Sequence, residues 1–568
     1  YYNQLASEAA ESGMTRADDC LRASGYIASW TTGSQLRPNT SCAGGNECTG
    51  TSSCFVTSNA RFRTTFEVGV PVGAATSQTV TVTGKVQLLG AASGKTWRTY
   101  SATYTARVGT DVAFNAIAFG YTNQQGAFFL TIAADGALRG VGSNYYGQLG
   151  DGTTVSNTKP TTYTLASGAD PIQVYAGFLS QGFNSYVRTS DGRLFAAGLN
   201  NHGQLGDNTK TDRSTAVQVQ MPAGVRAIGL YPNGRNAFVL GDDNRLYAMG
   251  ECIAGQLGSG YSIAGCLDQV VPKQVSLPAY SAGDLNTHPT ARISADATTV
   301  YVIMEGGRVY GWGGNTYGQL AKGDTTDSST PVKIGTFGDT GKPKAISIAF
   351  DGDDLTVVDS NGLVGTVGRN RFGMLGNGTT TQSNTLVNFP LPPGSGKAIK
   401  ASSDHSSVSV LTDAGQVWSA GLNDKGQLGN GAVATNQTTP VRFILPAGVL
   451  ATDLYSTSTG LASDFSNLFV VGSNGRVYGA GSNVFGQLGN GTMTAYQATP
   501  VVMGVIDGTV IRASSVQSGY GTTIILTTNN KIYTVGHNDN GQLGDGTTTD
   551  SSTPVANRYT NVIPFTFY

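Results

Sequence analysis

Short apolar strands and polar turns alternate along most of the chain in a fixed internal order. Runs such as "RLFAAG" (193–198), "RVYGWG" (308–313) and "QVWSAG" (416–421) each follow a two-residue turn of the hairpin type. Each run is followed by the four residues Gly-Gln-Leu-Gly or a close variant. The second residue of the turn lies 11 positions before the first glycine of this motif in every unit. The pattern predicts a small antiparallel sheet that is repeated along the chain.

The Gly-Gln-Leu-Gly motif or its variant occurs eight times, at intervals of 52 to 63 residues. Its first glycines are Gly147, Gly203, Gly255, Gly318, Gly373, Gly426, Gly486 and Gly541. A period in this range predicts a β-propeller or a solenoid, because one such sheet cannot bury both of its faces whereas a ring of sheets can. We expect the leucine to anchor each bend, the glutamine to bond backbone groups, and the following Thr/Ser tract to cross the surface.

A second landmark, usually a proline, follows the motif glycine by 13 or 14 residues in seven units. It is Pro160, Ala216, Pro331, Leu386, Pro440, Pro500 or Pro554. In the unit at Gly255 the landmark is Pro272, 17 residues on, so this unit holds about four extra residues. The same unit carries Cys252 and Cys266, which predicts a local disulfide that closes the insertion.

The stretch "DGRLFAAGLNNHGQLGDNT" (191–209) and its seven sisters resemble the repeats of the regulator-of-chromosome-condensation family, over about residues 112–568. The resemblance implies a β-propeller, which in this family usually has seven blades. Eight full units predict an eight-bladed ring here, with seven blades and one irregular unit as the alternative. We expect the apolar C-terminal "NVIPFTFY" (561–568) to pair with the first blade and close the ring.

The preceding residues predict a separate small α+β domain, residues 1–110, ahead of a propeller at residues 111–568. The first 24 residues have helical spacing of apolar positions, with Gly25 as the stop. Three strands are predicted after it, beginning at Arg61, Thr79 and Lys95. This layout resembles the globular half of a type IV pilin or pseudopilin, and the alternative is a generic secreted α+β cap. The fold class is therefore mainly β.

The charge balance and the cysteine pattern limit which binding partners and which cellular location are expected. Lys+Arg number 35 and Asp+Glu 36, so no basic surface for nucleic acid is expected. No apolar run is long enough to span a membrane, and the start at Tyr1 indicates processing or truncation upstream. The six cysteines are Cys20, Cys42, Cys48, Cys54, Cys252 and Cys266. An even, clustered set predicts disulfides and an extracytoplasmic location; zinc at the first four is the alternative, but paired C-x-x-C spacing is absent.

No catalytic motif stands out, so we predict a protein that is not an enzyme. We expect His202 and His537, at or near the bends, to be exposed turn residues. The densest acidic stretch holds Asp351, Asp353 and Asp354. No cofactor is expected; calcium at these oxygens is the alternative to a solvated loop, although the EF-hand spacing is missing.

The variable segments between the landmark and the next turn are the predicted binding loops. The family resemblance implies that they lie on one face of the ring, at a position that typically reads Gly-x-x-His-Ser/Thr, and His405 alone keeps that histidine. The other units offer aromatic residues, which suit partner recognition unless they pack between blades. These are Phe119, Tyr121, Phe178, Phe183, Tyr231, Phe350, Tyr455 and Tyr520.

Fold alone does not choose among functions. Members of this family act in nucleotide exchange on a small GTPase, chromatin binding, lipid or ubiquitin-ligase scaffolding, and secreted inhibition of β-lactamases. Disulfides and the lack of a basic arm argue against the exchange-factor function. We expect a surface-displayed or pilus-associated adhesin that binds a protein or glycan on another surface, with other pilin subunits as partners of the N-terminal helix. The alternatives are a secreted propeller that binds or inhibits a protein, and an extracellular polysaccharide-acting enzyme.

Overall fold

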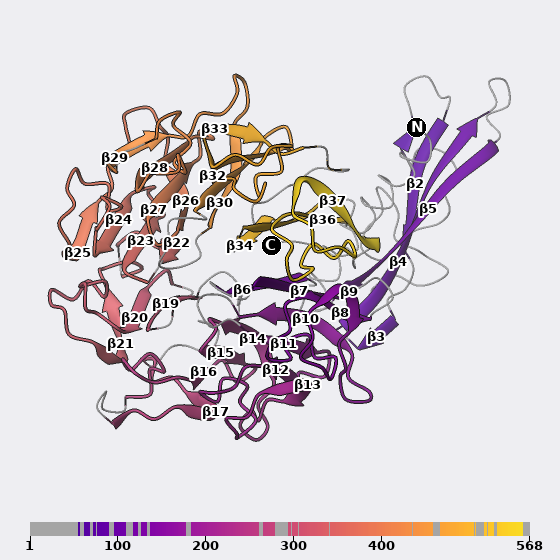
Figure 1. Ribbon diagram of the computed structural model, residues 1–568, viewed down its shortest axis with the longest axis horizontal. Coiled ribbons are helices and arrows are strands. Elements are labelled where there is room, and N and C mark those ends of the chain that lie inside the picture. Colours follow the sequence, from indigo (N-terminus) through magenta and orange to yellow (C-terminus); the bar gives the residue numbers. More distant parts are fainter. Residues whose placement is uncertain are drawn as a thin grey trace. The chain divides into compact units, whose positions relative to one another are not determined.

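A computed structural model describes two sets of strands and no helix among the residues it describes (Figure 1). The described residues are 55–56, 62–68, 72–74, 77–89, 96–108 and 117–560. Within the last range the gaps are 123–125, 133–136, 178–182, 261–264, 279–292, 297, 305, 340, 351, 434–435, 458–465, 505, 507–515, 520 and 528–530. No helix in this part of the chain is long and apolar enough to cross a membrane.

The first set of strands is an antiparallel sheet. Its members are β1 (Phe55–Val56), β2 (Phe62–Val68), β3 (Val72–Ala74), β4 (Ser77–Leu89) and β5 (Thr96–Val108). Strand β4 is central, with β5 along one edge and β2 and β3 along the other. The strands predicted from Arg61, Thr79 and Lys95 are thus confirmed as β2, β4 and β5. The predicted helix and Cys20, Cys42, Cys48 and Cys54 lie outside the described residues, so the pilin-like domain stays a prediction.

The second set forms eight four-stranded antiparallel sheets, which confirms the eight-bladed propeller (Figure 1). Blades 1 to 4 are β6 (Ile117–Thr122), β7 (Gly126–Ile132), β8 (Leu138–Gly142), β9 (Asn157–Thr162); β10 (Pro171–Ala176), β11 (Asn184–Thr189), β12 (Leu194–Gly198), β13 (Arg213–Gln218); β14 (Ala227–Pro232), β15 (Asn236–Gly241), β16 (Leu246–Gly250), β17 (Gln269–Gln274); β18 (Ile293–Ala295), β19 (Thr299–Ile303), β20 (Val309–Gly313), β21 (Ser328–Ile334). Blades 5 to 8 are β22 (Ala345–Phe350), β23 (Asp354–Asp359), β24 (Val364–Gly368), β25 (Ser383–Asn388); β26 (Ala398–Ser403), β27 (Ser407–Thr412), β28 (Val417–Gly421), β29 (Gln437–Arg442); β30 (Ala451–Thr457), β31 (Asn467–Gly472), β32 (Val477–Ser482), β33 (Tyr496–Val502); β34 (Val516–Gly519), β35 (Thr522–Leu526), β36 (Lys531–Gly536), β37 (Ser551–Thr560).

Burial changes systematically across each blade. The second strands, such as β15 and β27, are buried along their whole length because neighbouring blades cover both faces. The fourth strands, such as β9 and β29, are half exposed. Six of the eight landmark positions are prolines in these outer strands, where a missing N–H costs no ladder bond and discourages pairing with another chain.

A buried asparagine holds each bend together in seven of the eight blades. It lies three residues before the motif glycine: Asn144, Asn200, Asn315, Asn370, Asn423, Asn483 and Asn538. Its Oδ1 accepts the N–H of the motif leucine at 2.8–3.1 Å. Its Nδ2 donates to the carbonyl oxygen nine residues ahead, in the Thr/Ser tract, at 3.0–3.2 Å. We call this side chain the bend asparagine; it ties the tight bend to the loop that follows.

The motif glutamine acts as predicted. Its Oε1 accepts the N–H of the residue directly before the motif glycine, at 2.9–3.1 Å in the seven blades that carry glutamine. The motif leucine is buried in every blade. The bend is therefore a closed polar turn around one apolar anchor.

One backbone joint links each blade to the next. The bend reaches across and donates an N–H to a carbonyl oxygen of the next blade's outer strand, at 2.7–3.1 Å, in all eight positions. In the eighth joint Gly546 N donates to Thr158 O at 3.0 Å, so blade 8 binds blade 1 as every other pair is bound. The "NVIPFTFY" segment expected to close the ring lies outside the described residues.

Removing a bend asparagine should destabilise the propeller. In Asn200→Ala the buried Leu205 N–H loses its acceptor at 2.9 Å, and the carbonyls of Thr209 and Thr211 lose a donor. We expect the free energy of unfolding to fall by roughly 2–3 kcal/mol, measured by guanidinium denaturation. Asn361→Ala, at an exposed turn, is the control and should change little; equal losses would contradict the role of the bend asparagine.

The closing joint can be compared with an internal one by adding a methyl group. Gly541 has φ +73°, and a Cβ there would lie 2.4 Å from Thr158 Cα; at Gly203, φ +78°, it would lie 2.7 Å from Val270 Cα. We expect Gly541→Ala and Gly203→Ala to destabilise similarly, each by more than about 1 kcal/mol. Gly224→Ala, with φ +81° and no atom within 4 Å of the Cβ, reports backbone strain alone. A loss at Gly541 no greater than at Gly224 would show that the ring is not closed there.

Candidate functional site

One face of the ring carries both the variable loops and the bends. Because each blade is a simple antiparallel meander, the loop between its first and second strands and the bend between its third and fourth emerge at the same end. We call this the loop face. The hairpin turns lie on the opposite face. Functional side chains brought together by the fold are therefore expected where the loops of neighbouring blades meet.

The strand 1–2 loops of blades 3, 4 and 6 are short and capped by their first side chain. Asn233 Oδ1 accepts the N–H of Asn236 at 2.9 Å. Asp296 Oδ1 accepts the N–H of Thr299, and Asp404 Oδ1 that of Ser407, at 2.6 and 2.7 Å. These oxygens fix tight Asx-type turns, so these three loops form a stiff rim on the loop face.

Blade 5 places a second set of charges beside this rim. Asp353 pairs with Arg369 at 2.6 Å, and the Arg369 guanidinium lies over the ring of Tyr317 from blade 4, 4.5 Å from its centroid. Asp354 is 1% exposed and accepts the N–H of Asn370 at 2.8 Å. The corresponding first residue of strand 2 is neutral in the neighbouring blades, for example Thr299 and Ser407.

Two aspartates of the rim, and Asp354 beside it, hold protons more tightly than a free aspartate does. Burial raises the pKa of Asp354 to about 8, with the nearby Asp353 adding to the effect and the Asn370 N–H opposing it. Burial likewise raises the pKa of Asp296 to about 7 and of Asp404 to about 6, against the hydrogen bonds of their turns. The charge of this rim therefore changes across the neutral pH range.

Gly352 brings the loops of blades 4 and 6 close together. It has φ +107°, and a Cβ at this position would lie 2.8 Å from Asp296 Oδ2 and 3.4 Å from His405 Nε2. Burial lowers the pKa of His405, Asp353 raises it and Arg369 lowers it further. A carboxyl group and an imidazole thus face the same small space, and the pKa shift of each group favours its uncharged form.

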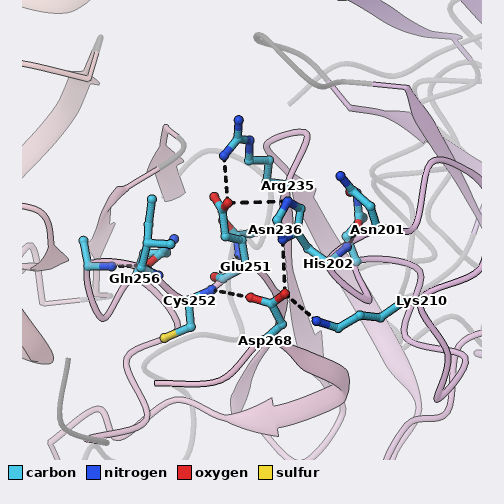
Figure 2. Close-up of polar contacts among 12 residues, drawn as sticks. Asn201, His202, Lys210, Arg235, Asn236, Glu251, Cys252, Gln256 and Asp268 are labelled. Atoms are coloured by element: carbon cyan, nitrogen blue, oxygen red, sulfur yellow. Dashed lines mark hydrogen bonds and ion pairs between the residues drawn. The ribbon is translucent and has the colours of Figure 1, made fainter. Parts of the chain in front are cut away.

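A second charged cluster joins blades 2 and 3 (Figure 2). His202 lies between two carboxylates: its Nε2 is 3.5 Å from Glu251 Oε1 and its Nδ1 is 3.1 Å from Asp268 Oδ2. Arg235 pairs with the same Glu251 oxygen at 2.7 Å, and Lys210 with the same Asp268 oxygen at 2.7 Å. The Glu251 side chain is 5% exposed, so Arg235 neutralises a carboxylate that is largely removed from water.

The two clusters occupy the same positions of their blades with opposite charge. Arg235 and Asp353 are the last residues of their strand 1–2 loops, and Glu251 and Arg369 lie 16 positions further on in both blades. The residue before the motif glycine of the preceding blade covers the pair: His202 in one case and Tyr317 in the other. Blades 1 and 2 show the same arrangement with aromatic rings, Tyr146 against Phe183, with centroids 4.6 Å apart.

Parts of the repeated sequence match models of a known repeat family. Residues 306–358 and 474–526 match the model of the regulator of chromosome condensation repeat, and residues 513–542 match a second model of that repeat. These matches identify regulator of chromosome condensation repeats in two parts of the propeller, across blades 4 and 5 and across blades 7 and 8. The two matches of the first model begin at the hairpin turns of blades 4 and 7 and end in the second strands of blades 5 and 8. The repeat unit therefore includes the bend and the joint to the next blade.

Proteins of known name are similar to much of this chain at low sequence identity. The ultraviolet-B receptor UVR8 of Arabidopsis thaliana is 26% identical over 66% of this chain and 80% of its own length. The human E3 ubiquitin-protein ligase HERC2 is 25% identical over 74% of this chain, but the match spans 7% of its own length. The crystal structure of human WBSCR16 superposes with a TM-score of 0.50 at 18% identity, over 66% of this chain and 96% of that one, which shows a shared fold.

The aromatic residues predicted on the loops of the repeats pack inward where the structure describes them. Phe183 is 7% exposed, and Phe350 packs edge-on against Tyr301 with centroids 4.7 Å apart. Tyr231 and Tyr455 are half-buried against core clusters between blades. Of Phe119 and Tyr121 the structure describes only the backbone in β6, and Phe178, Asp351 and Tyr520 lie outside the described residues.

Other predicted residues have mixed outcomes. The Cys252–Cys266 disulfide is present as predicted. The prediction that His537 is exposed is wrong: it is 7% exposed and stacks on Phe485 with centroids 4.1 Å apart, because a bend residue of blade 7 covers it. No group of three or more His, Cys, Asp or Glu side chains among the described residues is arranged to hold a metal ion.

Sequence reasoning missed the residue before the motif glycine. It is an aromatic ring in Tyr146, Tyr317, Phe372 and Phe485, a charged or polar group in three other blades, and alanine in blade 3. The signal is the recurring aromatic residue in "NYYG", "NTYG", "NRFG" and "NVFG", which is absent from the other four units. In blades 1, 2, 4 and 7 this residue contacts a side chain of the next blade on the loop face.

The buried Asp354 should make stability depend on pH. Its folded pKa of about 8 exceeds that of an unfolded aspartate, about 4. The wild type should therefore lose stability as pH rises from about 4 to about 8 and reach a lower plateau above that range. Asp354→Asn stays neutral throughout, so it should be the more stable protein at pH 8.5 and close to wild type at pH 4.5, measured by guanidinium unfolding.

Asp191→Asn provides a control of opposite sign. Hydrogen bonds from Thr189 and Arg193 overcome desolvation and lower the pKa of Asp191. Its stabilisation is therefore present at neutral pH and lost in acid, and the variant should be less stable than wild type at neutral pH. If Asp354→Asn followed the same course, Asp354 would be an ordinary ionised carboxylate.

Proposed function

We propose that this chain is a binding protein that recognises a macromolecular partner through the loop face of its propeller. The observation that carries the proposal is the pair of charge-reversed clusters around Glu251 and Arg369. They place ionised groups of both signs on one rigid face, on elements locked by buried hydrogen bonds, which suits selective recognition of a complementary surface. A rigid frame also lowers the entropy lost on binding.

We propose further that the protein acts outside the cytoplasm. The Cys252–Cys266 disulfide supports this, because such bonds persist in oxidising compartments. Within that setting we favour an adhesin displayed on the surface or at a filament, with a protein or glycan on another surface as its ligand. A secreted propeller that binds or inhibits one soluble protein is the second candidate, since several positions of the face are charged rather than aromatic.

An enzymatic function on a polysaccharide is a third candidate, supported by a specific observation. Asp296 and His405 approach the same point beside Gly352, and their shifted pKa values suit proton transfer near neutral pH. The two side chains come from the strand 1–2 loops of blades 4 and 6, on either side of blade 5. Turnover of a polysaccharide that is lost in His405→Ala would move this candidate ahead of a pure binding function.

Binding can be tested with two matched arginine variants. Arg371 is exposed beside the bend of blade 5 on the loop face, whereas Arg245 is exposed at a hairpin turn on the opposite face. We expect wild type and Arg245→Glu to bind a cell surface, glycan array or immobilised protein panel equally, and Arg371→Glu to bind at least about tenfold more weakly, a change of about 1.4 kcal/mol.

The readout separates the candidates. Retention on cells or glycans supports the adhesin, and capture of one stoichiometric soluble protein supports the secreted binder. No binding above an albumin control would overturn the proposal. Equal binding by both arginine variants would move the contact surface away from the loop face.

A further inference from the structure

Blade 3 departs from the other seven blades at the residue that holds the bend. Cys252 stands three residues before Gly255, where every other blade has the bend asparagine. A cysteine side chain offers no amide that could accept the Leu257 N–H and donate to carbonyls of the following tract. This blade therefore needs another means of tying its bend to its loop.

The disulfide supplies that connection. Cys252 is bonded to Cys266, 14 residues ahead. In the other blades the bend asparagine reaches the residue nine positions ahead and, in five of them, a carbonyl 11 positions ahead. With the insertion of about four residues in this unit, Cys266 occupies a place in the loop comparable to those carbonyls. A covalent bond has replaced the amide hydrogen bonds.

The remaining loop contact depends on Asp268. Cys252 N donates to Asp268 Oδ1 at 3.2 Å. Other blades make this contact with the aspartate 12 residues after the bend asparagine, as in Asn200 to Asp212 at 2.7 Å and Asn538 to Asp550 at 2.8 Å. Asp268 lies two residues beyond Cys266, so the disulfide restrains the segment that carries it.

Asp268 also joins blade 3 to blade 2. Its Oδ2 accepts from Lys210 Nζ at 2.7 Å and lies 3.1 Å from His202 Nδ1 (Figure 2). Lys210 and His202 both belong to blade 2. The disulfide thus holds the carboxylate through which two blades meet on the loop face.

The Cys252–Cys266 disulfide is accessible to a thiolate from the side of Cys266. Cys252 is 5% exposed, but Cys266 is half-buried and lies beside Leu267, which is 74% exposed. The core of the bend has a separate support, because Trp312 Nε1 of blade 4 donates to Gln256 O at 2.9 Å. Loss of the disulfide would therefore release the loop without removing the bend from the core.

We propose that the Cys252–Cys266 disulfide is a redox-controlled clasp of the joint between blades 2 and 3. A dithiol reductant attacks one sulfur as thiolate and forms a mixed disulfide, and its second thiol then displaces the protein cysteine. The two protein sulfurs together gain two electrons and two protons, and the dithiol is oxidised to its disulfide. Asp268 then leaves His202 and Lys210, and the charged surface between the two blades changes.

Two double variants of the full chain test the clasp. Cys252→Ser/Cys266→Ser imitates the reduced state, whereas Cys252→Asn/Cys266→Ser restores the side chain that the other blades use. We expect the thermal unfolding midpoint of the Ser/Ser variant to lie roughly 2 °C or more below that of wild type, with the Asn/Ser variant between the two. Dithiothreitol should lower the unfolding midpoint of the wild type toward that of the Ser/Ser variant. Any change that dithiothreitol causes through the other four cysteines should appear equally in both variants, so it can be subtracted.

Two further measurements connect the chemistry to the joint. Alkylation and peptide mapping of the folded wild type in dithiothreitol should show Cys252 and Cys266 modified. Lys210→Ala should lower the midpoint less in the Ser/Ser background than in wild type, because the two changes act on one joint. An unmodified disulfide in the folded reduced sample, a Ser/Ser variant as stable as wild type, or equal effects of Lys210→Ala in both backgrounds would overturn the proposal.

Discussion

The amide of the bend asparagine is the interaction on which the propeller depends. One buried side chain accepts the N–H of the anchoring leucine and donates to a loop more than eight residues away, so a tight turn and a polar surface tract become one rigid element. That element carries the backbone group that binds the next blade. Tract residues with little apolar surface can therefore be ordered, because their carbonyl groups find a donor that is itself fixed in the core.

A constant frame of this kind allows neighbouring positions to vary. The outer joint between blades uses backbone atoms and is the same around the ring. The inner contact on the loop face uses side chains and differs at each position: rings at Tyr146 and Phe183, ions at His202 and Glu251, an arginine over Tyr317. In each repeat, backbone atoms thus maintain the common fold, whereas side chains make the surface of each blade different.

Much of the architecture could be predicted from the sequence because its signals are local and recur in register. A constant spacing of 11 positions from the turn to the motif glycine predicted the hairpin and the bend in each unit, and eight copies predicted eight blades. The site was harder to predict, because its contacts join residues about 50 positions apart in different blades, such as His202 and Glu251. The burial of His537 and of Phe183 follows from the neighbouring blade, which no pattern within one unit reveals.

The joint between Gly546 and Thr158 has a topological consequence. Every blade is made from four consecutive strands, so among the described residues no strand is exchanged between the first and last blades. Seven joints are backed by the polypeptide that runs from one blade to the next, whereas the eighth is held by non-covalent contacts alone. The eight joints thus close the ring, although the polypeptide does not connect blade 8 to blade 1. The joints themselves do not determine which blade comes first in the sequence. A circularly permuted polypeptide would encode the same closed surface, with the non-covalent seam moved to a different pair of blades.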